Sequence, residues 1–300
     1  MRRNLLLAEF ASTPWALTPD YLSLMAGVLT RWALDEPMSA EIRDQIDQDK
    51  EVRNNRQSQQ PKSGAVAVIP VYGVITQRPP QDISGSGGTS TMNIARAVKS
   101  AANDPAVSQI LLDIDSPGGS VYGMVEVGDE IYQARAKKPV VAIANSLSAS
   151  AAYWLGSQAS EFYVAPGGEV GSIGVYTAHQ YLGKYLEDMG IKMTLISAGK
   201  YKVEGNQIEP LGDEAKAAIQ ARVDDYYSAF VAAVARGRGV TAAQVKSGMG
   251  QGRVLGETEA LAEKMIDGVI AYDALVDKMM MASAPTRSKL AGAKRELALL

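Results

Sequence analysis

The 300-residue chain contains no cysteine and only one histidine. The lack of cysteine excludes a disulfide framework, a thiolate zinc site and a cysteine nucleophile. Lys and Arg total 30 against 33 Asp and Glu, so no basic surplus points to a nucleic-acid partner. The apolar run at 5–7 is broken by Glu9, and no run reaches the roughly 18 residues that a membrane span needs. We therefore expect a soluble chain without a membrane anchor.

Apolar residues make up 46% of the chain, which is enough for a full core. Residues 14–34 carry apolar side chains at roughly helical spacing, and Thr18-Pro19 suits an N-cap followed by proline at the first helical position. The following stretch is rich in Gln, Asn and Arg, which indicates a linker. The predicted units are an N-terminal segment with a docking helix (1–40), a polar linker (41–63), a main domain (64–278) and a C-terminal tail (279–300).

In the main domain, short apolar runs typical of buried strands alternate with amphipathic segments. The expected strands are 65–76, 108–115, 139–145, 161–165 and 192–197. The expected helices are one ending near 103–105, then 121–136, one from about 148, 178–189 and 213–236. This alternation predicts an α/β domain with a mostly parallel sheet that is buried on both faces.

Two segments at the ends of predicted strands could carry chemistry. Ser-Pro-Gly-Gly (116–119) follows the strand ILLDID, at the edge where parallel sheets place ligand sites. Its glycines could direct backbone N–H groups into a cavity, although a plain turn explains the motif equally well. Ser150, in ASAAYW, would lie at a helix start among small residues, where many serines act only as caps.

A serine nucleophile needs a base, and the chain offers two kinds. His179 is the single histidine, in TAHQYL. Lysine is the alternative, because burial lowers its pKa and makes a neutral amine available. Lys200 and Lys202 both follow the predicted strand KMTLIS, and spacing alone does not choose between them.

The order of these motifs resembles the signal peptide peptidase A family of serine peptidases. The matching segments span roughly 65–270 and are VAVIPVYGVI, DSPGGS, ASAAYW, GSIGV, AGKYK and GRVLGETEALAEKMID. The resemblance implies a ClpP/crotonase-like α/β fold with repeated ββα units. This chain departs from the family pattern in having Ser-Ala-Ala-Tyr for the commoner Ser-Gly-Gly-Tyr, and Ala-Gly-Lys-Tyr-Lys for Ser-Gly-x-His-Lys.

The resemblance also implies roles for single residues. Ser150 matches the nucleophile and Lys202 the general base of a Ser/Lys dyad, with Lys200 as a nearby competitor. The N–H of Gly119 and that of Ser150 or Ala151 would form the oxyanion hole. Further substrate-binding residues would be Gly118, Ser116 and Ser172. No metal or cofactor is implied.

Three strings favour one branch, the capsid-assembly (prohead) proteases of tailed phages: TPWAL, TAHQYL and KVEGN. This branch implies protein substrates such as scaffold, portal or coat protein, and a homo-oligomeric ring in which serine and lysine can come from neighbouring subunits. The location would be the host cytoplasm or procapsid interior, or otherwise the bacterial cytoplasm. The tail after 279 would then be scaffold-like or processed.

Four alternatives stay open at this stage. One is a Ser150/His179 triad with Asp113 or Asp115 as the orienting acid. Another is a cellular signal peptide peptidase A-like protease that degrades peptides. A crotonase-type acyl-CoA enzyme would use paired backbone N–H groups without needing Ser150, and a scaffold with a decayed site would be non-enzymatic.

Overall fold

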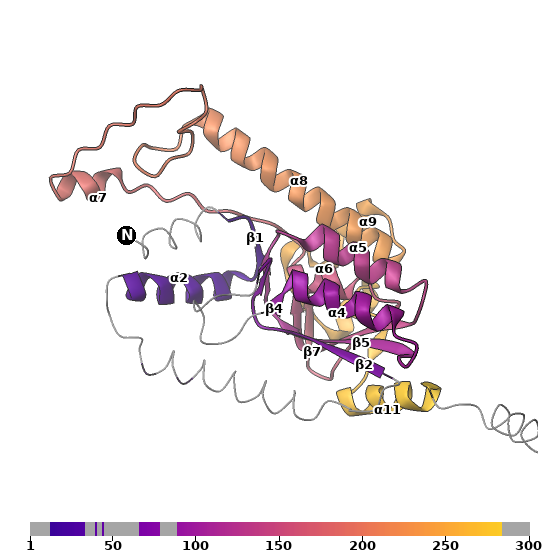
Figure 1. The fold of residues 1–300 in the computed structure, drawn as a ribbon. Helices are drawn as coiled ribbons and strands as arrows, with labels where there is room; N and C mark the ends of the chain where they lie inside the picture. Colours follow the sequence, from indigo (N-terminus) through magenta and orange to yellow (C-terminus); the bar gives the residue numbers. More distant parts are fainter. Residues whose placement is uncertain (1–12, 34–39, 41–43, 45–65, 79–88, 284–300) are drawn as a thin grey trace, which may run out of the picture.

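The computed structural model describes residues 13–33, 40, 44, 66–78 and 89–283. Within these residues the strands form a sheet of seven, whose main path is β10-β9-β7-β5-β2, and a sheet of four in the order β1-β6-β3-β4. The predicted linker (41–63), apart from position 44, and the tail after 283 lie outside the described residues. Helices pack around the larger sheet, and one arm projects away from it (Figure 1).

The chain builds this body by twice repeating a ββα unit. The first unit is β2 (Val66–Tyr72), β3 (Ile75–Thr76) and α4 (Thr91–Asn103), with β4 (Thr89–Ser90) before the helix. The second is β5 (Gln109–Ser116), β6 (Gly118–Ser120) and α5 (Met124–Ala134). The single strand expected at 65–76 is therefore two strands, because Gly73 adopts a positive φ of 64° and turns the chain toward the second sheet.

The larger sheet is buried on both faces, as its continuous apolar runs predict. β2, β5, β7 (Val140–Ala149) and β8 (Glu161–Val164) are parallel neighbours. Along β5, Ile110 and Leu112 belong to the main core with α4, α5 and α6 (Ala151–Gly156), whereas Leu111 packs against α11 (Tyr272–Ser283) on the opposite face. The α/β class and the mostly parallel sheet are confirmed.

The C-terminal part closes the body. Its remaining elements are β9 (Glu169–Gly171), α8 (Asp213–Arg238), α9 (Ala242–Ser247), a 3-10 turn (Met249–Gly252), β10 (Val254–Gly256), α10 (Glu257–Ala262) and β11 (Gly268–Val269). Trp154 of α6 stacks on Phe230 of α8, with ring centroids 4.7 Å apart, and this contact anchors the C-terminal half of the long helix. Among the described helices, none has both the length and the apolarity that crossing a membrane requires.

Residues 177–212 form the arm, which carries α7 (Gly183–Asp188) far from the sheets (Figure 1). The strand predicted at 192–197 is wrong, because these residues are not in a strand and pair with no other part of the chain that the structure describes. The side chain of Ile196 is 95% exposed. The helix predicted at 178–189 is likewise shorter than expected.

The N-terminal helix is confirmed as α2 (Pro19–Ala33), which begins at the predicted proline. The residues just before it do not continue the helical pattern. Trp15–Leu17 form the short strand β1, which pairs antiparallel with β6. Pairing with a distant segment decides the structure of these residues, and local spacing could not reveal it.

An ion pair joins the end of α8 to the larger sheet and gives a testable pH dependence. The two terminal guanidinium nitrogens of Arg238 donate to the carboxylate of Asp267, at 2.8 and 2.9 Å, and the N–H of Phe162 donates to the same group. Partial burial opposes ionisation of Asp267, but these hydrogen bonds outweigh it and hold its pKa below the usual value. The folded state therefore gains stability from the ionised form.

Asp267→Asn is expected to lower the free energy of unfolding at pH 7 by on the order of 2 kcal/mol, the value of hydrogen bonds to a charged group. Because the folded pKa is depressed, this stability is present above the unfolded pKa of about 4 and is lost as pH falls through the folded value. Thermal unfolding measured between pH 7 and pH 3 should show that the difference in stability between wild type and variant shrinks as the pH falls. The control is Asp129→Asn, because Asp129 forms a more exposed ion pair with Arg236. This substitution should lower the free energy of unfolding by about 1 kcal/mol or less.

Candidate active site

The two candidate loops follow neighbouring strands and meet at one edge of the larger sheet. β5 and β7 run parallel, and Ser116 pairs in register with Ser148. The position that a Cβ on Gly118 would occupy lies 2.9 Å from Cβ of Ser150. The Ser-Pro-Gly-Gly loop and the start of α6 are therefore in direct contact, as ligand sites at the carboxyl ends of parallel strands require.

Ser150 occupies a strained turn between β7 and α6. Its φ of 55° and ψ of −118° are unusual for a residue with a side chain, and its N–H donates to the carbonyl of Gly171 at 2.7 Å. The side chain is 1% exposed, and Oγ has no hydrogen-bond partner among the described residues. A strained serine with an unused, buried hydroxyl is typical of a nucleophile held ready by its surroundings.

The Ser-Pro-Gly-Gly loop is rigidly held. The buried hydroxyl of Ser116 donates to the carbonyl of Gly73 at 2.6 Å and accepts from the N–H of Gly118 at 3.2 Å. Gly118 has a φ of 104°, and a Cβ on Gly119 would lie 1.9 Å from the carbonyl oxygen of Ile75. Both positions therefore require glycine. Ser116 contributes to this site by shaping the loop.

These contacts narrow the choice of oxyanion donors. The N–H of Ser150 is already bonded to Gly171, so of the two amides considered at the helix start only that of Ala151 is left for an oxyanion. Ser172, with a φ of 56°, follows Gly171, and its own N–H donates to the carbonyl of Arg253 at 2.7 Å. Residues 171 and 172 thus brace the backbone of the serine.

The two lysines lie on the arm, in the loop between α7 and α8 (Figure 1), and the protomer does not bring them to Ser150. Lys200 bonds the hydroxyl of Tyr201 at 2.7 Å and the carboxylate of Glu214 at 2.9 Å, and these bonds raise its pKa. A general base must be neutral, so this pairing counts against Lys200. Lys202 is exposed and makes no side-chain hydrogen bond or ion pair with any described residue.

The alternative triad is not assembled in the protomer. Nε2 of His179 lies 2.9 Å from the carbonyl oxygen of Asn206, within the arm. Asp113, 2% exposed, accepts the hydroxyl of Tyr72 in the core, and Asp115 accepts the hydroxyl of Ser146. Neither carboxylate is placed to orient the histidine.

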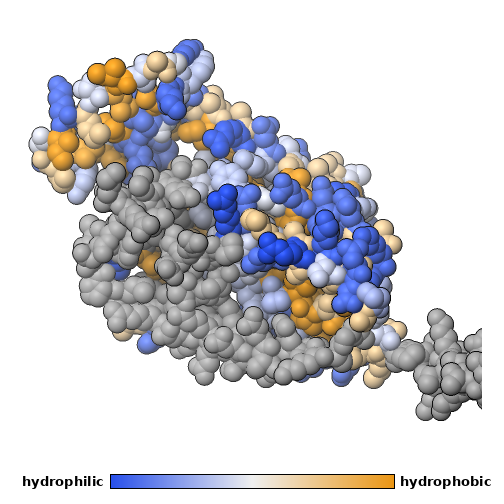
Figure 2. Space-filling model, viewed as in Figure 1, coloured by the Kyte–Doolittle hydropathy of each residue, from blue (hydrophilic) through white to orange (hydrophobic). Residues whose placement is uncertain are grey.

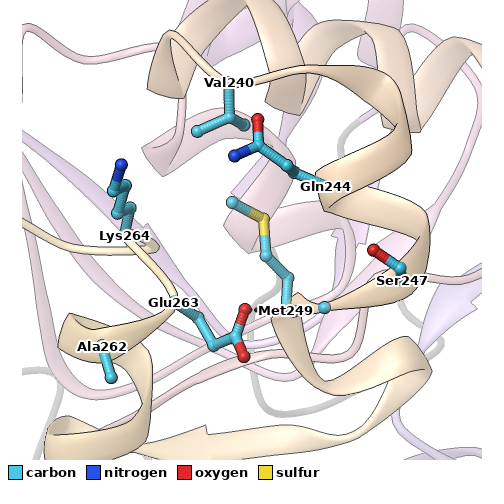
Figure 3. Close-up of a pocket in the computed structure, with 8 residues that line it drawn as sticks. Val240, Gln244, Ser247, Met249, Ala262, Glu263 and Lys264 are labelled. Carbon is cyan, nitrogen blue, oxygen red and sulfur yellow. Dashed lines mark hydrogen bonds between the residues drawn. The ribbon is translucent and has the colours of Figure 1, made fainter.

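A surface cavity of about 320 Å³ lies elsewhere, between α9, the 3-10 turn and α10 (Figure 3). Met249 lies at its centre, and the carboxylate of Glu263 accepts the N–H of Met249 at 3.1 Å. Ser150 and the Gly-Gly loop do not line it. Among the described residues, no cluster of three or more His, Cys, Asp or Glu side chains could hold a metal ion.

Sequence reasoning missed two contributors to the site. One is Tyr176, whose backbone pairs with Trp15 of β1. Its half-buried hydroxyl has no hydrogen-bond partner among the described residues, and burial raises its pKa to about 12. The other is β1, which lies beside the Gly-Gly loop. The string TPWAL contained the only signal, since a short apolar run before proline suits a strand as well as a helix start.

Comparison with known proteins gives a family match over much of this body. The model of Peptidase family S49 matches residues 132–285. Capsid assembly protease C of Escherichia phage lambda is 34% identical over 229 residues, covering 76% of this chain and 52% of that protein. Head-tail preconnector protein GP5 of Enterobacteria phage P21 is 38% identical over 176 residues, covering 59% of this chain and 35% of that protein.

Cellular proteases and solved structures are more distant. Protease 4 of Salmonella typhi is 29% identical over 216 residues, covering 72% of this chain and 34% of that protein. ClpP1 from Listeria monocytogenes superposes with a TM-score of 0.42 at 16% identity, covering 71% of this chain and 95% of that one. A membrane protease from Pyrococcus horikoshii that is specific for a stomatin homologue superposes with a TM-score of 0.43 at 17% identity. The match covers 71% of this chain and 78% of that one.

The chain thus spans about half the length of the lambda protein and about a third of the P21 protein. The family model covers just over half of this chain and includes Ser150, Ser172 and Lys202. On this match, the chain belongs to Peptidase family S49.

Proposed function

We propose that this protein is a serine endopeptidase that cleaves scaffold or other head proteins during phage capsid assembly, with Ser150 as nucleophile and Lys202 as general base. The observation that carries the proposal is Ser150 itself, strained, buried and without a hydrogen-bond partner among the described residues, against a rigid Gly-Gly loop. The family match supports peptide-bond hydrolysis over the acyl-CoA alternative. The two phage relatives support the capsid role.

In the proposed mechanism, a neutral Lys202 takes the proton of Ser150 as Oγ attacks the carbonyl carbon of the substrate. The N–H groups of Gly119 and Ala151 hold the developing oxyanion, and each such donor is typically worth about 2.7–4 kcal/mol. Lys202 then gives its proton to the leaving amine. Water hydrolyses the acyl-enzyme in a second step, in which the same lysine acts again as base.

The separation of the two groups in the protomer favours a site shared between copies. Ser150 lies in the body, whereas Lys202 lies on the arm. Apolar side chains gather on the arm, in the upper left of Figure 2. The exposed ones are Tyr181, Tyr185, Met189, Ile191, Met193, Ile196 and Tyr201. Such a patch is typical of a protein interface. Docking the arm on a second copy would bury this patch and bring Lys202 to the other copy's Ser150, where burial lowers a lysine pKa.

Casein, an unfolded protein, provides a test of which base acts. Wild type, His179→Ala and Lys200→Ala are each expected to cleave it at rates within about threefold, because neither side chain takes part in the proposed chemistry. Peptide products would be followed by mass spectrometry at matched protein concentration.

A dead His179→Ala variant that still folds and assembles would overturn the lysine assignment in favour of the histidine triad. A dead Lys200→Ala variant would move the base from Lys202 to Lys200. Failure of the wild type to cleave casein or any head protein would remove the peptidase proposal itself.

A further inference from the structure

The strand β1 lies between two segments of the body and is hydrogen-bonded on both edges. On one side it pairs antiparallel with β6, with Ala16 opposite Gly119. On the other side Trp15 and Tyr176 exchange both backbone hydrogen bonds, at 2.8 and 3.0 Å. Residues 15–17 are all at least 94% buried. An extended peptide bound along a strand edge makes this same pattern of contacts.

The hydrogen-bond pattern identifies which carbonyl faces the oxyanion loop. Directly opposed residues of an antiparallel pair alternate between exchanging both hydrogen bonds and exchanging none. The N–H of Thr18 donates to the carbonyl of the opposed Pro117 at 3.1 Å, and the N–H of Val121 donates to the carbonyl of the opposed Pro14 at 3.3 Å. The Ala16–Gly119 pair, midway between these two, is therefore hydrogen-bonded. The carbonyl of Ala16 accepts from the N–H of Gly119, which is the donor proposed for the oxyanion.

The same carbonyl lies near Ser150, beside Gly118. The position that a Cβ on Gly118 would occupy is 2.2 Å from the carbonyl oxygen of Ala16 and 2.9 Å from Cβ of Ser150. The two atoms therefore lie within about 5.1 Å of each other, the sum of these two distances, beside the same glycine of the loop. Oγ of Ser150 has no hydrogen-bond partner among the described residues. The peptide bond that follows this carbonyl is Ala16–Leu17.

We propose that residues 14–18 occupy the peptide-binding channel as a substrate does, and that Ser150 cleaves the Ala16–Leu17 bond of the chain itself. This proposal rests on the proposed function. Oγ of Ser150 bonds the carbonyl carbon of Ala16 and loses its proton to the lysine. The bond to nitrogen of Leu17 then breaks, and that nitrogen takes the proton. Water hydrolyses the ester, leaving a carboxylate at Ala16 and a free amine at Leu17.

The fit of the strand also defines a substrate class. Ala16 is fully buried within the core cluster that includes Ala151 and Ala152. A larger side chain before the cleaved bond would have no space there without displacing this packing. The channel therefore selects extended peptides with a small residue before the scissile bond.

The test follows the full-length chain by intact mass over time, at a concentration where it self-associates, with casein in the same reaction. Wild type is expected to lose residues 1–16, and Ser150→Ala to stay whole. Ala16→Ser, the matched control, should be cut like wild type, whereas Ala16→Phe should be cut at least tenfold more slowly. Synthetic peptides of residues 11–21, native and Ala16→Phe, added to wild type repeat the comparison without relying on the folding of a variant.

The outcomes distinguish failure of the self-cleavage proposal from failure of the proposed peptidase function. A wild type that digests casein but retains residues 1–16 overturns self-cleavage alone. Equal cleavage of the native and Ala16→Phe peptides overturns the inferred selection for a small residue before the scissile bond. A wild type that digests neither casein nor itself overturns the proposed peptidase together with its self-cleavage.

Discussion

Ser150→Ala is expected to reduce cleavage of casein and of head proteins by at least about 10⁴-fold, to the background of the assay. The variant loses only Oγ, which has no hydrogen-bond partner among the described residues, so the fold should be retained. The backbone strain at this position is set by the bond from its N–H to Gly171, which alanine also makes. Activity by mass spectrometry and melting temperature by thermal unfolding, measured on one preparation, separate lost chemistry from lost structure.

Ser148→Ala is the matched control for this experiment. Ser148 lies on the same strand, is fully buried, and also has a hydroxyl without a partner among the described residues. It should keep activity within a few-fold of wild type, because its hydroxyl is given no chemical role. Cleavage that persists in Ser150→Ala and disappears in Ser148→Ala would show that Ser148, and not Ser150, is the nucleophile.

Lys202→Ala should be as inactive as Ser150→Ala, yet mixing the two inactive proteins is expected to restore activity. If each site takes its serine from one copy and its lysine from the next, a random equal mixture in a closed ring forms complete sites at about a quarter of positions. Casein cleavage by the mixture should then approach about a quarter of the wild-type rate. The reason is geometric, since Lys202 lies on the arm and Ser150 in the body.

The control for the mixing experiment is Lys202→Ala combined with the double variant Ser150→Ala, Lys202→Ala, which supplies no lysine and should stay inactive. Native mass spectrometry establishes that mixed oligomers form. Mixed oligomers without restored cleavage would show that serine and lysine act within one copy, and would require the arm to fold back onto its own body.

Local signals were sufficient for much of the fold. The N-cap and proline at Thr18-Pro19 mark the start of α2, and the apolar runs of β5 and β7 mark strands buried on both faces. These predictions succeed because capping, propensity and burial act within a few residues of sequence. That the Gly-Gly loop and the start of α6 lie together was implied by the family resemblance, and the structure explains it, because parallel neighbours place their carboxyl ends at one edge.

Local signals failed where a distant partner decides the structure. KMTLIS has the composition of a strand, yet on the arm it has no strand neighbour among the residues that the structure describes, and an apolar run alone cannot supply one. Trp15–Leu17 is the opposite case, since three residues become a strand only because β6 and Tyr176 lie on either side.

By itself, the sequence determined the residue types available for catalysis, the α/β class and the strand ends at which Ser150 and the Gly-Gly loop lie. Only the tertiary structure decided that the Ser150 hydroxyl is buried without a hydrogen-bond partner among the described residues, that Lys202 lies away from it on the arm, and that Ala16 pairs with Gly119. The physical reason is that composition and periodicity report burial along one segment. Hydrogen bonds between segments far apart in the chain, such as that from the N–H of Thr18 to the carbonyl of Pro117, depend on the packing of the whole chain.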